Sequence, residues 1–182
     1  MKTMILLVGF PGVGKSHVAR ILDKKLKHAL YFDSDLFSKI YMRTHKFSFT
    51  GISRNEEMKW RLIFHQAKLN KIKEYFKKYD IIFLDTCFDL QNSRKIFYKF
   101  AKDNRLKLLV VEVKCPSHIV KKRIFKNRHE KERMVGSKAS RWKLHEDMKL
   151  WWKPIKKVDF TLYSQKDVDK QIEKFLKQQN LS

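Results

Sequence analysis

The residues GFPGVGKSH, from Gly9 to His17, place the strictest limit on how this chain can fold. They follow a short apolar run at residues 4–8, and apolar residues with helical spacing begin at Val18 and continue to Leu26. A continuous apolar run of this kind is typical of a strand buried in a parallel sheet. A glycine-rich connection between such a strand and a helix predicts an α/β domain that binds an anion where the helix begins.

The stretch matches the phosphate-loop pattern G-x-x-x-x-G-K-[ST] in full. Its glycines let successive backbone N–H groups turn inward and form a nest for phosphate. In this pattern the lysine contacts the β- and γ-phosphates and the serine hydroxyl binds Mg²⁺. We therefore assign Lys15 a catalytic role as well and Ser16 a metal-binding role. The predicted nucleotide-binding residues are Gly9, Pro11, Gly12, Val13, Gly14, Lys15, Ser16 and His17.

Outside this stretch, short apolar runs alternate with segments whose apolar residues have helical spacing. The predicted strands are residues 4–8, 29–32, 81–84, 106–113 and 158–163. The predicted helices are residues 15–26, 36–41, 55–78, 92–102, 117–127, 141–152 and 168–176. Alternating strands and helices favour right-handed crossovers and a parallel sheet. We expect one α/β domain over residues 1–182, a doubly wound five-stranded parallel sheet with helices on both faces.

The chain has a large excess of basic residues, with 42 Lys and Arg against 19 Asp and Glu and a net charge of +23. Such a field attracts polyanions and raises their rate of encounter. Most of these residues are lysines scattered over predicted helix faces, which is also typical of an ordinary solvated surface. A nucleic-acid partner and a basic surface without a partner both remain open at this point.

The sequence contains no pattern that predicts a membrane anchor or a disulfide framework. No apolar run approaches the roughly 18 residues that a membrane span requires. The apolar run near the N-terminus leads into the glycine-rich stretch instead of a small-residue cleavage site. The two cysteines, Cys87 and Cys115, have neither metal-ligand nor disulfide spacing. We expect a cytoplasmic protein without membrane contact, and no feature predicts an oligomeric state.

Three further segments follow the glycine-rich stretch. They are YFDSD at residues 31–35, IIFLDTCF at residues 81–88 with Arg94 soon after, and VEVKCPSHIVKKRIFKNR at residues 111–128. In this order the segments resemble the small P-loop kinases of the adenylate-kinase-like fold, which include polynucleotide kinases, the zeta-toxin group and seryl-tRNA kinases. The resemblance extends over most of the chain. It implies a P-loop NTPase of the kinase type that uses ATP and Mg²⁺ to phosphorylate a hydroxyl acceptor.

The resemblance also implies a catalytic carboxylate at the end of the second strand. In such kinases this carboxylate accepts the proton of the acceptor hydroxyl and orients the oxygen for attack. Asp35 is favoured by a D-x-x-R pattern and Asp33 is the alternative, although position 38 is Ser38 and only the neighbouring Lys39 can replace the arginine. The alternative for each aspartate is a helix N-cap, and Asp33 suits that role for a helix that starts near Leu36, as does Ser34.

Asp85 ends the third predicted strand, and the resemblance implies that it holds Mg²⁺ through water, as a Walker B carboxylate does. The alternative is an aspartate that caps the loop after the strand. Thr86 and Arg94 are candidates for the acceptor side of the site. An arginine within a helix is more often merely solvated, so Arg94 is the weaker of the two.

A lid is expected at residues 128–140, which are polar, basic and without periodicity. Kinases of this type close an arginine-bearing lid over ATP and exclude water. A guanidinium pairs with two phosphate oxygens at once and stabilises charge during transfer. Arg123 and Arg128 are therefore catalytic candidates ahead of Arg133, and ordinary surface arginine is the alternative for each.

An acceptor-side segment is expected at residues 41–54, YMRTHKFSFTGISR, which reads as a loop. Basic residues interleaved with aromatic ones suit a nucleic-acid strand, because phosphates meet the charges and bases stack on the rings. The alternative is that the rings of Phe47 and Phe49 anchor the loop to the core. The favoured function is an ATP-dependent phosphotransferase acting on RNA, DNA or a nucleotide-like molecule. A small-molecule kinase and a nucleotide-hydrolysing switch without an acceptor are the alternatives.

Overall fold

The structure is a computed structural model that describes residues 1–47, 51–86, 91–126 and 137–181, except for the side chains of Arg54 and Trp151. Its strands are β1 (Thr3–Val8), β2 (Ala29–Phe32), β3 (Ile81–Thr86), β4 (Lys107–Lys114) and β5 (Phe160–Tyr163). Its helices are α1 (Lys15–Lys25), α2 (Ser34–Thr44), α3 (Arg54–Tyr75), α4 (Gln91–Asp103), α5 (Ser117–Lys126), α6 (Lys138–Trp151) and α7 (Val168–Gln179).

The five strands form one parallel sheet in the order β2-β3-β1-β4-β5, which confirms the predicted fold class. Strand β1 lies at the centre and all six of its residues are buried, which explains the uninterrupted apolar run from Met4 to Val8. Leu7 pairs with Asp85 on β3, and Val8 pairs with Glu112 on β4. The residues that follow β1 therefore start at the edge where the carboxyl ends of β3 and β4 also lie.

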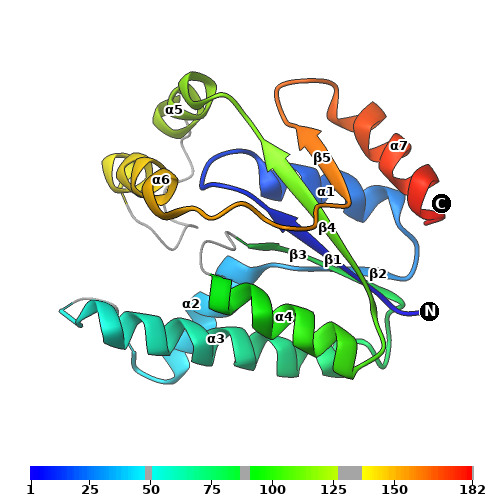
Figure 1. Cartoon of the computed structure of the whole chain (residues 1–182), viewed down its shortest axis with the longest axis horizontal. Helices are drawn as coiled ribbons and strands as arrows, with labels where there is room; N and C mark the ends of the chain where they lie inside the picture. The colour runs from blue at the N-terminus through cyan, green and yellow to red at the C-terminus, as the bar shows by residue number, and fades with distance from the viewer. Residues whose placement is uncertain (48–50, 87–90, 127–136, 182) are drawn as a thin grey trace.

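Helices cover both faces of the sheet (Figure 1), so each face has its own apolar core. Ile5 and Leu7 of β1 pack with residues of α1, α5 and α7. Met4, Leu6 and Val8 of the same strand point the other way and pack with residues of α3 and α4. The period of two in a strand sends alternate residues to opposite faces, so both neighbours of each apolar residue must also be apolar.

Two predicted boundaries were wrong because helices extend beyond their apolar spacing. Asp33 caps the start of α2, and at its other end this helix continues to Thr44, so the first residues of the expected loop at 41–54 are helical. Ser137 accepts a hydrogen bond from the Ser140 amide and caps α6, so the end of the expected lid at 128–140 is also helical. Residues 128–136 lie outside the described residues. The other predicted elements occur with ends shifted by a few residues.

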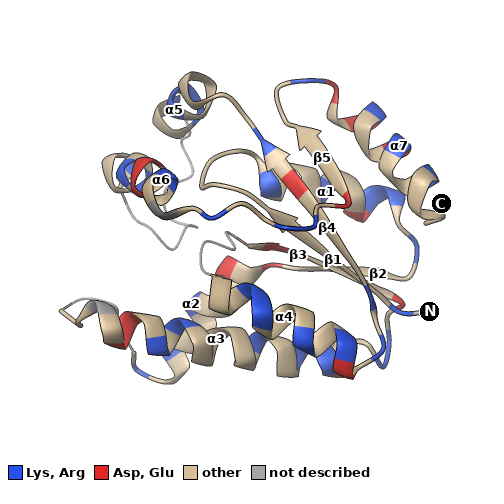
Figure 2. Cartoon of the chain, in the orientation of Figure 1, with Lys and Arg blue, Asp and Glu red and all other residues tan. Residues whose placement is uncertain are grey.

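Lys and Arg residues are spread over the helices and connections of the ribbon (Figure 2). In the part of the chain that the structure describes, no helix has the length and apolar character to cross a membrane.

Candidate active site

The phosphate loop connects β1 to α1 and is held closely against its neighbours. Gly9 has a φ of +148°, and a Cβ atom there would lie 2.5 Å from the Val113 carbonyl oxygen of β4. Gly12 has a φ of +82° and lies against Val120 and Ile124 of α5. Only glycine combines these backbone conformations with such close approach. The glycines therefore allow the loop to bend within a crowded strand-to-helix connection.

Lys15 is folded back across the loop. Its Nζ donates to the carbonyl oxygens of Gly9 at 3.0 Å and Phe10 at 3.1 Å. The ammonium thus lies over the residues that the motif assigns to phosphate binding. A triphosphate in the loop would offer oxygens of opposite charge, which are stronger acceptors for the lysine than neutral carbonyls.

Ser16 and Asp85 meet at the start of α1. The Ser16 hydroxyl donates to Asp85 Oδ2 at 2.9 Å, and the Asp85 side chain is buried at the end of β3. Asp85 Oδ1 is buried without a hydrogen-bond partner among the described residues. A hydroxyl and a carboxylate are the oxygen ligands that Mg²⁺ prefers, so this pair fits the ion.

The pair is too small to bind a metal ion by itself. Within the described residues, no group of three or more His, Cys, Asp or Glu side chains has the arrangement of a metal site. Mg²⁺ usually takes one or two protein ligands and completes its shell with phosphate oxygens and water. Ser16 and Asp85 are thus suited to a magnesium ion that arrives with nucleotide.

Tyr31 on β2 completes this side of the site, and the sequence analysis did not select it. Burial raises the pKa of Tyr31, and the negative charges of Asp85 and Asp33 raise it further. The hydroxyl therefore stays protonated at neutral pH and is available as a donor to the neighbouring carboxylate. Its ring is stacked on Phe83 with centroids 5.5 Å apart, which holds it against β3.

The two candidate base residues have different surroundings. Asp33 Oδ1 accepts from the Leu36 amide at 2.9 Å, so the capping alternative is confirmed for this residue. Desolvation raises the pKa of Asp35, and the charge of Asp85 raises it further. The positive charges of Lys15 and Lys68 act in the opposite direction. The charges of the phosphate-loop lysine and of Asp85 therefore both act on the Asp35 carboxyl group. The assignment of Asp35 as the base stays a prediction.

Lys68 on α3 is a site residue that the sequence analysis missed. It is only 8% exposed, and no other lysine is buried among the residues described here. It lies on the same helix face as Leu69 and Ile72, whose side chains are in the core. A lysine in a helix of a basic protein reads as a solvated residue, so only its burial and its influence on Asp35 identify it.

Arg123 lies beside the phosphate loop, as the predicted role requires. Its Nη1 donates to Ser164 Oγ at 2.8 Å and approaches the Val13 carbonyl at 3.5 Å, and its Nη2 donates to the Ser164 carbonyl at 2.9 Å. The guanidinium thus connects α5, the loop after β5 and the phosphate loop. The catalytic assignment of Arg123 stays a prediction. Arg128 and Arg133 lie outside the described residues.

Arg94 is not solvated, contrary to the expectation for an arginine within a helix. It is buried, its Nη1 donates to the Pro154 carbonyl at 3.0 Å, and its guanidinium lies 5.2 Å from the Trp152 ring centroid. Its hydrogen bond joins α4 to the connection between α6 and β5. On α6, two more buried polar residues, Arg141 and His145, were also missed by the sequence analysis.

The aromatic rings of the acceptor-side segment pack against α3. The Tyr41 ring lies 5.2 Å from that of Phe64, and the Phe47 ring lies 4.0 Å from that of Trp60. This is the anchoring alternative considered for the rings. Arg43 remains exposed, as do His45 and Lys46. Phe49 lies outside the described residues, as does the side chain of Arg54.

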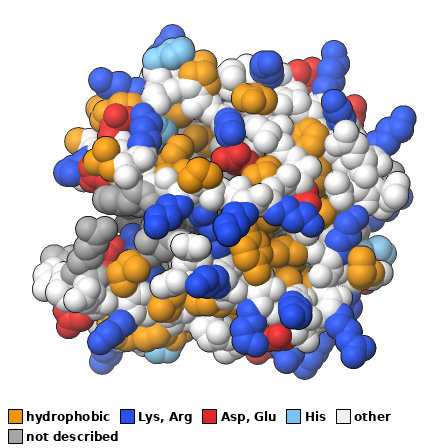
Figure 3. Space-filling model, in the orientation of Figure 1, with side chains coloured by type: hydrophobic (Ala, Val, Ile, Leu, Met, Phe, Trp, Pro, Cys, Tyr) orange, Lys and Arg blue, Asp and Glu red, His pale blue; other side chains and the backbone are white. Residues whose placement is uncertain are grey.

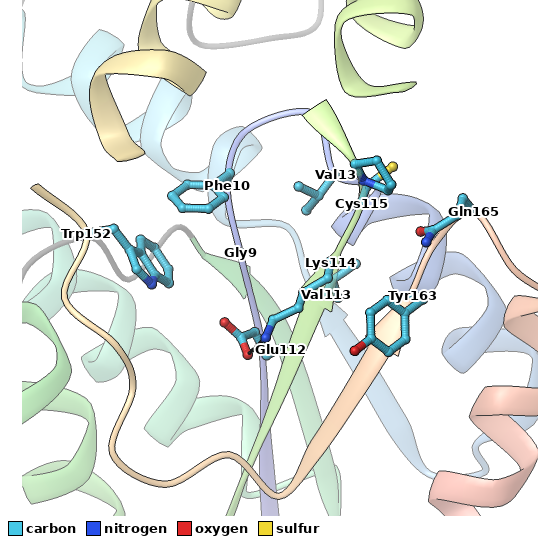
Figure 4. Close-up of a pocket in the computed structure, with 11 residues that line it drawn as sticks. Gly9, Phe10, Val13, Glu112, Val113, Lys114, Cys115, Trp152, Tyr163 and Gln165 are labelled. Carbon is cyan, nitrogen blue, oxygen red and sulfur yellow. Dashed lines mark ion pairs between the residues drawn. The ribbon is translucent and has the colours of Figure 1, made fainter. Parts of the chain in front are cut away.

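A pocket of about 330 Å³ adjoins the phosphate loop at the carboxyl ends of β4 and β5 (Figure 4). We call it the β4–β5 pocket. Its wall includes Phe10 of the loop, the aromatic rings of Trp152 and Tyr163, and the amide of Gln165. It lies on the side of the loop away from β2 and β3, and hence away from Asp35. An apolar pocket with a few polar groups is the usual form of a small-molecule site.

Solved structures with the same fold are small P-loop kinases. The tunicamycin resistance protein of Deinococcus radiodurans is 13% identical with a TM-score of 0.66, and the match covers 100% of this chain and 98% of that chain. The APS kinase of Mycobacterium tuberculosis, solved with AMPPNP and APS, is 16% identical with a TM-score of 0.62, covering 98% of each chain. A Janibacter sugar kinase is 11% identical with a TM-score of 0.65, covering 100% of this chain and 96% of that chain.

At these identities the likeness establishes a kinase-like P-loop fold and nothing finer. Comparison with curated proteins finds no match to this chain. A family profile, described as chromatin associated protein KTI12, matches residues 2–182. Because that match spans nearly the whole chain, the protein belongs to the KTI12 family.

Proposed function

We propose that this protein is an ATP-dependent phosphotransferase that moves the γ-phosphate to a hydroxyl acceptor. The observation that carries the proposal is that Asp35, in the first turn of α2, has a carboxyl group on which the charges of both Asp85 and Lys15 act. A nucleotide switch needs a phosphate loop and residues that bind Mg²⁺, such as Ser16 and Asp85. It does not need a second carboxylate near the γ-phosphate. A kinase needs that carboxylate as a base.

The chain's own residues account for each step. The acceptor oxygen forms a bond to the γ-phosphorus while the bond from phosphorus to the β–γ bridging oxygen breaks and ADP departs. The proton of the acceptor hydroxyl passes to Asp35. Lys15 leaves the Gly9 and Phe10 carbonyls for the phosphate oxygens, where its charge offsets theirs. Mg²⁺ held with Ser16 and Asp85 would neutralise charge on the same oxygens.

The β4–β5 pocket is the proposed site of the nucleotide base. The phosphate loop follows β1, and Asp35 lies beyond it on the β2 side of the sheet. If ATP binds with its triphosphate in the loop and the acceptor binds on the β2 side, the nucleoside of ATP extends toward β4 and β5. Trp152 and Tyr163 provide aromatic walls there, and the Gln165 amide provides both a donor and an acceptor for a base edge.

A nucleic acid or nucleotide-like molecule is the favoured acceptor. The net charge of +23 supports it. So does a band of Lys and Arg side chains across one face of the molecule, over the connection between α6 and β5 (Figure 3). Exposed Arg43 at the end of the Asp35 helix adds to this support. A small-molecule acceptor is the rival, because the rings of Tyr41 and Phe47 are occupied by α3 and do not stand free for stacking.

Transfer of label from γ-labelled ATP tests the proposal. The acceptors are 5′-hydroxyl RNA and DNA oligonucleotides, alongside a pool of nucleosides and small alcohols. We expect label on an oligonucleotide end, with none for Lys15→Ala and a loss of about 10²–10⁴-fold for Asp35→Asn, which still binds ATP. Label confined to the small-molecule pool would select the rival acceptor. ATP hydrolysis with no labelled acceptor, unaffected by Asp35→Asn, would refute the kinase assignment.

A further inference from the structure

The carbonyl groups of the phosphate loop are bound by side chains from elements distant in sequence. His145 of α6 contacts the Pro11 carbonyl oxygen through Nδ1 at 2.8 Å, across 134 residues of sequence. Ser164 and Arg123 contact the Val13 carbonyl oxygen. These contacts fix the direction of two peptide groups in the loop.

The direction of a peptide carbonyl decides the direction of the next N–H. In a planar trans peptide the C=O and N–H point in opposite directions. No peptide bond is cis in the described residues. With the Pro11 oxygen bound by His145, the Gly12 N–H points away from α6. His145 is only 1% exposed, so it contacts the loop from the packed side, and the Gly12 N–H is directed to the opposite side of that peptide.

The chemistry of the contact defines the histidine tautomer. A carbonyl oxygen only accepts hydrogen bonds, so Nδ1 carries the proton and Nε2 does not. Nε2 is buried and has no partner within the described part of the chain, which suits the neutral ring. Burial also lowers the pKa of His145, although the bond to Pro11 opposes this. Nδ1 therefore remains a donor in a neutral ring at physiological pH.

Ring packing holds the donor in place. The His145 ring is stacked on Trp142 of the same helix, with centroids 5.1 Å apart and planes at 13°. The edge of the ring meets Phe10 of the loop, at 5.6 Å between centroids. A Cβ-branched or flexible side chain would not reproduce this arrangement. A hydrogen bond and an aromatic contact thus join the loop to α6.

We propose that His145 is a positioning residue for phosphate binding, which holds the Pro11–Gly12 peptide so that the Gly12 N–H is directed at the phosphate site. The inference rests on the proposed function only in requiring that the loop binds nucleotide phosphate. It adds a specific residue, on an element far from the motif, to the phosphate-binding machinery. It also links α6 to the nucleotide, because whatever displaces the helix reorients the peptide.

The test measures separately how the protein binds the triphosphate part and the nucleoside part of ATP. Affinities are measured by calorimetry for ATP and inorganic tripolyphosphate, and for adenosine by displacement of a fluorescent ADP analogue. His145→Leu keeps most of the bulk and removes the donor. His145→Asn places an amide N–H near the position of Nδ1. His118→Leu, at an exposed position of α5, is the matched control.

We expect His145→Leu to weaken ATP and tripolyphosphate by the same factor of about 3–10, the value of one hydrogen bond. Adenosine should change less than about twofold, and His145→Asn should recover most of the loss. Equal loss for adenosine and tripolyphosphate, or unchanged affinity for both, would overturn the inference. If His145→Leu fails to fold, His145→Gln, whose amide lies near Nε2 instead, must bind tripolyphosphate more weakly than His145→Asn. A wild-type protein that binds neither ATP nor tripolyphosphate would refute the proposed function itself.

Discussion

Acidification should destabilise the protein through His65, a residue of α3 one turn before Lys68. Burial, together with the positive charges of Lys68 and Arg61, lowers the pKa of His65 from 6.5 to about 3. His65 Nδ1 is buried without a partner among the described residues, and the ring meets the edge of Phe97 at 5.4 Å. The folded protein therefore holds this ring neutral.

The sign of the effect follows from proton binding. Below pH 6.5 this histidine is protonated in the unfolded chain but not in the folded chain. The free energy of unfolding therefore decreases as the pH is lowered from 6.5 to about 3. Each pH unit in that window is worth about 1.4 kcal/mol. At pH 5, some 1.5 units below the ordinary value of 6.5, the free energy of unfolding should have lost about 2 kcal/mol. For a chain of 182 residues this corresponds to a fall of about 4–8 °C in Tm.

Urea denaturation at pH 7, 6 and 5 measures the effect, with His65→Phe as the comparison. The variant replaces the ring by an apolar one of similar shape and removes the titrating group. The carboxylates titrate equally in both proteins, so their contribution cancels in the difference. We expect the wild type to lose about 2 kcal/mol more than His65→Phe between pH 7 and pH 5. Parallel losses in the two proteins would show that the folded state admits a proton at His65.

Three substitutions test other parts of the site. Asp33→Ala should cost about 1 kcal/mol of stability through the lost helix cap while transfer persists, and loss of transfer with unchanged stability would reverse the assignment of the two aspartates. Lys68→Met should lower the rate of transfer at least about tenfold with ATP affinity nearly unchanged, because the charge of Lys68 lowers the pKa of Asp35 and so favours the ionised base; Lys73→Met, exposed on the same helix, should match wild type in the same assay. Gly9→Ala should abolish ATP binding in calorimetry, because its Cβ would lie 2.5 Å from a backbone oxygen of β4, and wild-type affinity would contradict the close packing of the loop.

The sequence alone predicted the features that depend on the pattern of consecutive residues. The apolar runs at residues 4–8 and 106–113 predicted buried parallel strands, because a strand covered on both faces has no polar side. The glycines from Gly9 to Gly14 predicted the phosphate loop, because few other sequences tolerate that backbone. From these local patterns both the fold class and the nucleotide end of the site could be predicted.

Which polar side chains enter the site was decided only when the faces of distant elements met. Lys68 and Lys73 belong to the same helix, yet one is buried near Asp35 and the other is exposed. His145 reaches Pro11 across 134 residues. Helical periodicity specifies which residues share a face, but it does not specify what that face contacts. Tertiary packing decides which partners a buried polar group has. It therefore gives the two aspartates of YFDSD different surroundings, so that Asp33 caps a helix and Asp35 is the candidate base.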